Sequence, residues 1–402
     1  MSKRMKRKTG KRKRQLQRKY FFRKLITTGA LVIAASAVLF GGVFLYKKIK
    51  ENANTVSMVA DVSGDNGSLN MEQSDSLAAV KAAMARPTSF SPRCIESTRP
   101  SLYIESTAIE TDGQTLASIS DYTPKENHSF DAGISYTDVD GIVTFRGNNF
   151  RDTAAYGNTQ IKDGKIKDLW TAKTGSLTYG DATWSGSGWT GQPLMEKWSK
   201  EVKQSMNMYD WAKEKDGLVE VIYACMDGYV YFLDLETGEA TRDPLYLGFT
   251  FKGAGALDPR GYPILYVGAG YDSNEGTARV FVVNLLDCSV MYTFGNNDPF
   301  SLRGNLSYFD SSALVDAKTD TLIYPGENGI LYLIKLNTSY DPEAGTLSIA
   351  PDNIVKWHYY GTRTSVASYW LGMEDSAAIY DGYIFMSDNG GNLMCLDLNT
   401  LQ

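Results

Sequence analysis

The sequence contains few of the residues from which metal centres and common hydrolytic sites are built. Its 402 residues include two histidines and four cysteines. Two histidines exclude a polyhistidine metal site and leave few candidates for a Ser-His-Asp triad. The cysteines are widely separated and form no CxxC pair, so zinc or redox chemistry gains no support. We therefore expect no metal, and we interpret Cys225, Cys288 and Cys395 as buried structural thiols.

Acidic residues are absent from the first 50 positions, which hold 16 of the 41 Lys and Arg residues. The remaining positions carry 25 basic and 46 acidic residues, a net charge of -21. A surface this acidic argues against nucleic-acid binding, because clustered Lys and Arg are needed to displace counterions from phosphates. The basic residues of the N-terminus are better explained by membrane topology than by RNA binding.

An uncharged apolar run follows the basic tail of residues 1–24 and extends over residues 25–46. As a helix it would be roughly 33 Å long, enough to cross a bilayer core. The excess of Lys and Arg before the run places the N-terminus in the cytoplasm and the rest of the chain outside the cell. A cleaved signal peptide is the alternative, with Ala35-Ser36-Ala37 as its site, but the apolar run continues beyond it. We expect a single-pass protein of a bacterial plasma membrane.

Residues 47–140 are rich in Ser, Thr, Asp, Asn and Ala and show weak periodicity. This composition is typical of a partly disordered spacer. Beyond it, residues 141–402 consist of short apolar runs separated by Gly, Asn and Asp turns, the pattern of an all-β domain. The sequence thus divides into a tail, an anchor, a spacer and a β domain.

The β domain repeats one hairpin pattern four times. The copies are VIYACMDGYVYFLDLETG (221–238), ILYVGAGYDSNEGTARVFVVNLLD (264–287), LIYPGENGILYLIKLNT (322–338) and YIFMSDNGGNLMCLDLNT (383–400). Small-residue strands precede three copies, at 191–195, 311–316 and 376–381, and further strands follow three, at 243–248, 290–295 and 355–361. Four antiparallel strands per unit, with units about 50 to 60 residues apart, predict the blades of a β-propeller.

The repeat resembles that of PQQ-like, quinoprotein-type β-propellers. The resemblance lies in GYVYFLDLETGEA (228–240), NGILYLIKLNT (328–338) and GNLMCLDLNTLQ (391–402), and FRGNNFRDTAAYG (145–157) resembles a segment that introduces such domains. The family carries a Trp in its outer strands, which here implies that Trp170 and Trp357 dock neighbouring blades. The last unit stops where its outer strand should begin, so we expect a C-terminally incomplete propeller. The alternative is a four-bladed ring closed by the strand that contains Trp170.

The resemblance leaves catalysis open as an alternative. Dehydrogenases of this family bind PQQ and calcium through Glu, Asn and Asp, and that set is not convincingly present here. Glu327 and Asn328 lie in a turn between strands, where Asn and Gly serve the backbone. We therefore favour a non-catalytic protein without a cofactor, and keep a PQQ-dependent dehydrogenase, with PQQ and calcium, as the alternative.

In a propeller, the loops that join one blade to the next gather on one face. Here these loops combine aromatic residues with isolated cations, which are residue types common in recognition surfaces. The ligand-binding candidates are Trp184, Trp189, Lys252, Arg303, Arg363 and Trp370, with Phe251, Phe300 and Tyr369 beside them. We expect this face to bind an extracytoplasmic protein, a peptide segment or a cell-wall glycan. The alternative is that these aromatic side chains plug the channel and pack the blade tops.

Overall fold

The computed structural model describes residues 93–402, apart from 129, 132–133, 159–163, 189–190 and 363–367. The basic tail and the apolar run predicted to be an anchor lie outside these residues. Within the described ranges, no helix combines the length and apolarity needed to cross a membrane.

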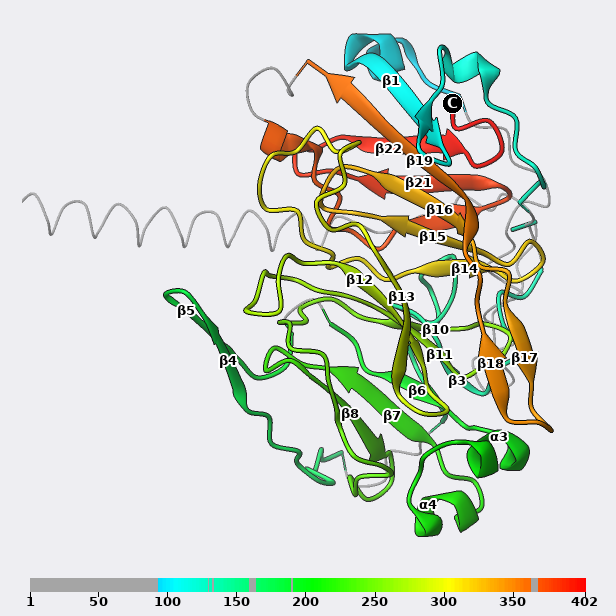
Figure 1. The fold of residues 1–402 in the computed structure, drawn as a ribbon, viewed down its shortest axis with the longest axis vertical. Helices are drawn as coiled ribbons and strands as arrows, with labels where there is room; N and C mark the ends of the chain where they lie inside the picture. Colours follow the sequence, from blue (N-terminus) through cyan, green and yellow to red (C-terminus); the bar gives the residue numbers. More distant parts are fainter. Residues whose placement is uncertain (1–92, 129, 132–133, 159–163, 189–190, 363–367) are drawn as a thin grey trace, which may run out of the picture. The chain divides into compact units, whose positions relative to one another are not determined.

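The described residues form mainly β structure, in four small antiparallel sheets arranged like the blades of a four-bladed propeller (Figure 1). The predicted all-β class and the four repeated hairpins are therefore confirmed. Neighbouring sheets pack through two apolar clusters, one joining the first three sheets and one joining the third to the fourth. Burial of these faces is the main stabilising contribution to the fold.

The first sheet has the order β3-β6-β7-β8-β9. Strand β8 alternates between buried and part-exposed residues, as its period-2 apolar pattern predicts. The turn before β8 ends at Gly228, whose positive φ of 90° favours glycine. The strands are β3 (Gly141–Ile142), β6 (Leu194–Glu196), β7 (Glu220–Ala224), β8 (Tyr229–Asp234) and β9 (Leu245–Tyr246).

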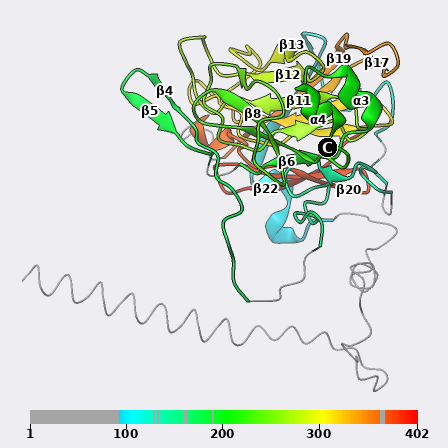
Figure 2. The same ribbon diagram turned by 90° about the horizontal axis from the view of Figure 1, so that it is seen from below.

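The chain of this first sheet contains two insertions. A hairpin of β4 (Ser176–Tyr179) and β5 (Ala182–Ser185) precedes β6 and extends away from the sheet in both views (Figures 1 and 2). Between β6 and β7 lie the short helices α3 (Lys200–Ser205) and α4 (Asp210–Glu214). Ser199 caps α3 by accepting a hydrogen bond from the Val202 amide at 3.3 Å.

The second sheet contains β10 to β13 in sequence order. Both central strands are buried along their whole length, which explains their continuous apolar sequences. Neighbouring sheets cover both of their faces. The strands are β10 (Ala256–Leu257), β11 (Ile264–Gly268), β12 (Val280–Asn284) and β13 (Ser289–Phe294).

The third sheet has the order β14-β15-β16-β19-β1-β2. Its last two strands come from the range interpreted as a spacer, so that range contains ordered structure that belongs to a blade. A separate hairpin, β17–β18, interrupts the chain between β16 and β19. The strands are β14 (Leu314–Asp316), β15 (Thr321–Pro325), β16 (Leu331–Lys335), β17 (Ser339–Asp341), β18 (Thr346–Ser348), β19 (Asp352–Gly361), β1 (Ile104–Thr111) and β2 (Gln114–Thr115).

The fourth sheet has three strands, β20 (Ala378–Tyr380), β21 (Tyr383–Ser387) and β22 (Leu393–Asp397). Its innermost strand and hairpin match the fourth predicted unit. Four single 3₁₀ turns complete the described structure: η1 (Glu96–Thr98), η2 (Pro100–Leu102), η3 (Ile119–Asp121) and η4 (Ser368–Leu371).

The cysteines only partly follow the prediction of buried thiols. Cys225 is buried, Cys288 is half-buried, and Cys395 is exposed. Cys395 lies on β22, where buried and exposed residues alternate, and its side chain falls on the exposed positions. The prediction for Cys395 was therefore wrong, because an apolar strand sequence does not show which alternate positions face the core.

Candidate functional site

The loops that lead from one blade into the next carry two buried ion pairs. Lys252, between β9 and β10, lies 2.7 Å from Asp310, which precedes β14. Both residues are more than nine-tenths buried. The ammonium group of Lys252 also lies 5.3 Å from the ring centroid of Tyr308. Lys252 therefore sits inside the protein and not on its surface.

Arg303 makes the second pair, between β13 and β14. Its Nη1 lies 2.9 Å from Oε1 of Glu327 and donates to the Glu327 carbonyl at 2.5 Å. The Arg303 side chain is fully buried, and its guanidinium carbon lies 4.9 Å from the ring centroid of Tyr369. Glu327 comes from the β15–β16 turn, so this contact joins a loop between blades to a turn within one.

Burial dominates the electrostatics of both carboxyl groups. It raises the pKa of Asp310 to about 6 and that of Glu327 to about 8, although Lys252 and Arg303 oppose the shifts. Glu374 also faces Glu327 and raises its pKa further.

Aromatic side chains lie near these pairs, and all of them except Tyr308, which is 9% exposed, are less deeply buried. The ring of Trp184, on β5, lies 5.1 Å from that of Tyr271, which in turn lies 5.0 Å from Tyr308. Tyr369 and Trp370, in η4, pack edge to face at 5.1 Å. Tyr369 is 39% exposed, while Trp184 and Trp370 are half-buried. We call the surface formed by these five aromatic residues and the loops around them the loop face.

The other candidates have different positions. Phe251 and Phe300 are buried, and the Phe300 ring stacks on His358 at 4.1 Å. Burial lowers the pKa of His358, and its Nδ1 lies 2.8 Å from the Phe300 carbonyl, so His358 has a packed position. Trp189 and Arg363 lie outside the described residues.

The two Trp residues expected at blade contacts both pack against β strands or their turns. Trp170 donates from Nε1 to the Leu235 carbonyl at 2.9 Å and covers Gly238 so closely that a Cβ there would lie 2.5 Å from the indole. Trp357, on β19, is 1% exposed and belongs to the apolar cluster of the third and fourth sheets. Neither indole lies on the loop face.

A cavity of about 350 Å³ opens beside Arg303. Its wall is formed by the β13–β14 loop and by the β11–β12 turn, both at the loop face. Most of the lining is polar. The lining includes Asp272, Thr277, Asp298, Ser301, Arg303 and Asn305.

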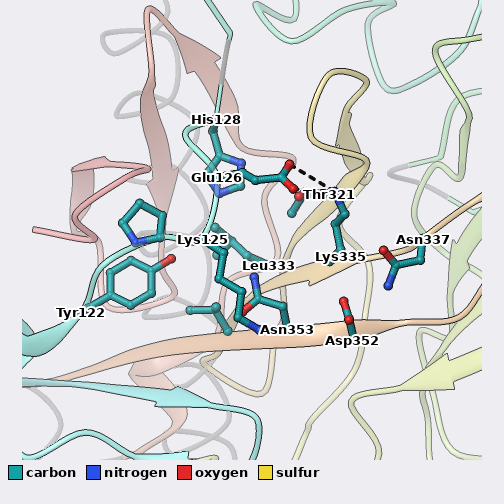
Figure 3. Close-up of a pocket in the computed structure, with 12 residues that line it drawn as sticks. Tyr122, Lys125, Glu126, His128, Thr321, Leu333, Lys335, Asn337, Asp352 and Asn353 are labelled. Carbon is teal, nitrogen blue, oxygen red and sulfur yellow. Dashed lines mark hydrogen bonds and ion pairs between the residues drawn. The ribbon is translucent and has the colours of Figure 1, made fainter.

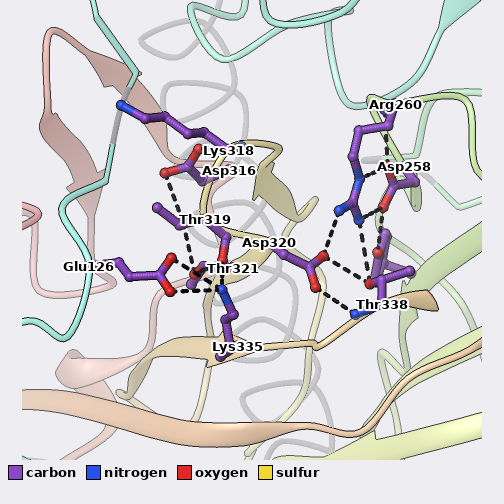
Figure 4. Close-up of polar contacts among 11 residues, drawn as sticks. Glu126, Asp258, Arg260, Asp316, Lys318, Thr319, Asp320, Thr321, Lys335 and Thr338 are labelled. Carbon is purple, nitrogen blue, oxygen red and sulfur yellow. Dashed lines mark hydrogen bonds and ion pairs between the residues drawn. The ribbon is translucent and has the colours of Figure 1, made fainter.

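A second recess, of about 180 Å³, lies at the opposite ends of the strands of the third sheet (Figure 3). There Lys335 reaches Glu126 at 3.1 Å and donates to the Thr319 carbonyl at 2.7 Å. Figure 4 shows this contact beside a network in which Arg260 pairs with Asp258 and Asp320. The charged groups of Lys335 and Arg260 are paired with neighbouring carboxylates. We therefore interpret the recess as a contact between the segment before β3 and the third sheet.

The sequence did not identify the acidic partners of Lys252 and Arg303. No sequence motif around Asp310 marks it as a site residue. Glu327 was interpreted as part of a turn whose residues serve the backbone conformation. Asn328 does serve its turn, since it accepts a hydrogen bond from the Ile330 amide at 3.2 Å and donates to the Tyr332 hydroxyl at 2.6 Å. In the described part of the chain, no group of three or more His, Cys, Asp or Glu residues is placed to hold a metal ion.

No family model and no curated protein matches the chain. Solved structures similar to it include BamB from Moraxella catarrhalis, at 14% identity over 57% of this chain and 62% of that one, with a TM-score of 0.32. A europium-containing methanol dehydrogenase has 13% identity over 66% and 58%, with a TM-score of 0.34. A quinohemoprotein alcohol dehydrogenase from Comamonas testosteroni has 14% identity over 65% and 48%, with a TM-score of 0.32.

The similar region spans less than two thirds of each of these three proteins. At these identities and TM-scores the likeness carries no argument. The fold follows from the sheets described above, and the function must be argued from the residues of this chain.

Proposed function

We propose that the protein is a single-pass plasma-membrane protein whose propeller lies outside the cell and binds a protein or cell-envelope ligand through the loop face. The observation that carries this proposal is the set of part-exposed aromatic side chains above the two buried ion pairs. Large aromatic side chains on a rigid support are the residues that contribute most to recognition.

The two ion pairs explain how the loops support such a surface. Lys252 and Arg303 hold their loops to Asp310 and Glu327 inside the protein, so these cations fix loop positions and do not themselves project to solvent. Trp184, on β5, and Tyr369 and Trp370, in η4, belong to other segments of the loop face and retain exposed area. The part-exposed aromatic residues favour recognition over the alternative in which they plug the channel.

The membrane part of the proposal depends on residues 1–46. The uncharged run of residues 25–46 has the length of a spanning helix, and the Lys and Arg excess before it favours a cytoplasmic N-terminus. The net charge of -21 after residue 50 suits a ligand that is neutral or positively charged overall, and disfavours nucleic acid.

Calorimetric titration of the full chain with solubilised cell-wall fragments, and separately with PQQ plus calcium, tests the proposal. We expect binding of wall fragments that Trp370→Ala or Trp184→Ala weakens at least tenfold without changing the unfolding temperature. Tyr209→Ala is the control, since Tyr209 is an exposed aromatic residue at the N-cap of α4, away from the loop face.

Micromolar or tighter PQQ binding would overturn the non-catalytic proposal. If both Trp variants bind wall fragments as tightly as the unmodified chain, the loop face is not the site. If neither Trp variant folds, the aromatic residues are a plug and the recognition proposal fails.

A further inference from the structure

The pair of Lys252 and Asp310 is the most deeply buried contact between a lysine and a carboxylate in the described part of the chain. Nζ of Lys252 lies 2.7 Å from Oδ2 of Asp310, and the two side chains are 10% and 5% exposed. Oδ1 of Asp310 has no hydrogen-bond partner among the residues that the structure describes. A buried pair of this kind is costly in its charged form, because both groups lose their hydration and one oxygen gains no donor.

Gly270 allows the two side chains to meet. A Cβ at this position would lie 2.4 Å from Cε of Lys252 and 2.4 Å from Oδ1 of Asp310, so any larger residue would force them to move. The backbone on both sides is held in place: the Gly270 amide donates to the Thr250 carbonyl at 2.7 Å, and the Phe309 amide donates to the carbonyl before Gly270 at 2.9 Å. The chain after β11 thus fixes the amine against the carboxyl group.

The surroundings of the pair favour its uncharged form. Burial raises the pKa of Asp310 to about 6, against the effect of Lys252, and Glu374 raises it further. The Tyr308 ring, whose centroid lies 5.3 Å from Nζ, is 9% exposed and helps to exclude water. Transfer of one proton from Lys252 to Asp310 gives a neutral amine beside a neutral carboxylic acid, and these are the forms that can react with each other.

We propose that Nζ of Lys252 and Cγ of Asp310 form an intramolecular amide bond, which covalently joins the loop before β10 to the loop before β14. The inference goes beyond the proposed function and does not depend on any ligand. Its consequence for the fold is a permanent connection between the second and third sheets, beneath the loop face.

The reaction is a condensation that needs no other reagent. One proton passes from Nζ to Oδ2, Nζ attacks Cγ, and a second proton follows from the nitrogen to Oδ2. The bond between Cγ and Oδ2 then breaks and Oδ2 leaves as water, while Oδ1 becomes the amide oxygen. An ammonium group and a carboxylate thus give one neutral amide and one water molecule, so atoms and charge balance.

The folded chain supplies what the reaction lacks in free solution. Groups held in contact react as though each were present at about 10⁵–10⁸ M, which favours both the rate and the yield of condensation. The product is neutral, so it avoids the desolvation of two buried charges. Burial also keeps out the water that would reverse the reaction.

Mass spectrometry of the denatured full chain tests the inference directly. We expect the intact mass to be lower than that of the sequence by one water molecule. Proteolysis should then yield one branched peptide that contains both Lys252 and Asp310, and trypsin should not cleave after Lys252. A succinimide at an Asp-Gly step would remove the same mass without producing a branched peptide.

Variants locate the bond. Lys252→Arg removes the primary amine and Asp310→Ala removes the carboxyl group, so each should have the full mass of its sequence. Asp310→Asn should release ammonia instead of water and reach the same final mass as the unmodified chain. Lys215→Arg is the matched control: Lys215 also lies 2.7 Å from a carboxylate, Asp234, but is 27% exposed, so this variant should still lack one water molecule.

A full-sequence mass for the unmodified chain overturns the inference, and this measurement does not require any variant to fold. A mass deficit that persists in Lys252→Arg also overturns it, as does a branched peptide that joins two other residues. Binding of wall fragments through Trp370 is measured separately and is unaffected by either result, so the proposed function and this inference can fail independently.

Discussion

At the scale of single residues, the first sheet is organised around a buried charge pair. Glu220 and Arg242 are both fully buried, and Arg242 donates from Nε to Glu220 at 3.1 Å. Trp198 donates to the same carboxylate at 2.8 Å. A buried charge that loses its partner destabilises a protein strongly, because its desolvation is no longer offset.

We therefore expect Glu220→Gln to lower the free energy of unfolding by about 3–5 kcal/mol. The double variant Glu220→Leu with Arg242→Met should recover most of this loss, since no unpaired charge remains. Urea unfolding of both variants measures the difference. A double variant no more stable than Glu220→Gln would show that the pair itself, and not the orphaned charge, supplies the stability.

Glu327 provides a prediction about pH. Burial raises its pKa from 4.5 to about 8 in the folded protein. Between these pH values the unfolded chain releases the proton and the folded chain keeps it, so the folded state binds more protons. Stability is then fully present below about pH 4.5 and is lost as pH rises through about 8.

Glu327→Gln keeps the neutral form at every pH. The stability of this variant relative to the unmodified chain should therefore rise steadily between about pH 5 and pH 8. Urea unfolding at several pH values gives this difference, in which the contributions of groups that do not interact with Glu327 cancel. A difference independent of pH would contradict the raised pKa of Glu327.

The repeat pattern located the loops between blades but not the state of their residues. Lys252 and Arg303 lie in two of these loops. Their burial could not be predicted, because their acidic partners lie on other loops and no local pattern joins the two halves. The cavity beside Arg303 likewise depends on contacts between two blades.

At the scale of elements, β1 is the main difference between expectation and structure. The sequence IESTAIET is too polar and too isolated from the repeats to indicate a blade strand. Its partner is β19, in which Trp357 lies opposite Ile109 and His358 opposite Ala108. The repeated hairpins were predictable because each pairs with itself across a short turn, whereas β1 pairs with a strand more than 240 residues away.

Ile109 is the residue through which β1 packs on the blade. It is 1% exposed and lies in the apolar cluster with Val355 and Trp357. We expect Ile109→Ala to cost about 2–5 kcal/mol of stability, and to speed hydrogen exchange of the β19 amides most. Glu105→Ala, at an exposed position of β1, is the control. Equal exchange in both variants would show that β1 does not stabilise the sheet.

At the scale of the whole described unit, residues 141–151 connect all four sheets. This segment contains β3 in the first sheet, then passes the inner strands of the others. Arg151 is buried and donates to carbonyl groups of the third and fourth sheets at 3.1 and 2.9 Å. The segment's hydrogen-bonding partners elsewhere are Leu257, Ser312, Ala313, Ala377 and Ile379. The motif that resembles the start of a propeller domain thus joins its blades.

The proposed topology can be tested with the native cysteines. Cys94 is exposed and follows the proposed anchor, while Cys225 is buried, with a pKa raised to about 12 by burial. In intact bacteria that express the full chain, we expect a membrane-impermeant maleimide to label Cys94 without permeabilisation. Burial also raises the pKa of Cys395, which should make that thiol slower to react despite its exposure.

The control places a thiol on the other side of the proposed anchor. Ser2→Cys, introduced together with Cys94→Ser and Cys395→Ser, should react only after the cells are permeabilised. The opposite pattern, with position 2 labelled in intact cells and Cys94 protected, would place the propeller in the cytoplasm. A cytoplasmic propeller could not reach cell-wall fragments, so the envelope ligand would be excluded.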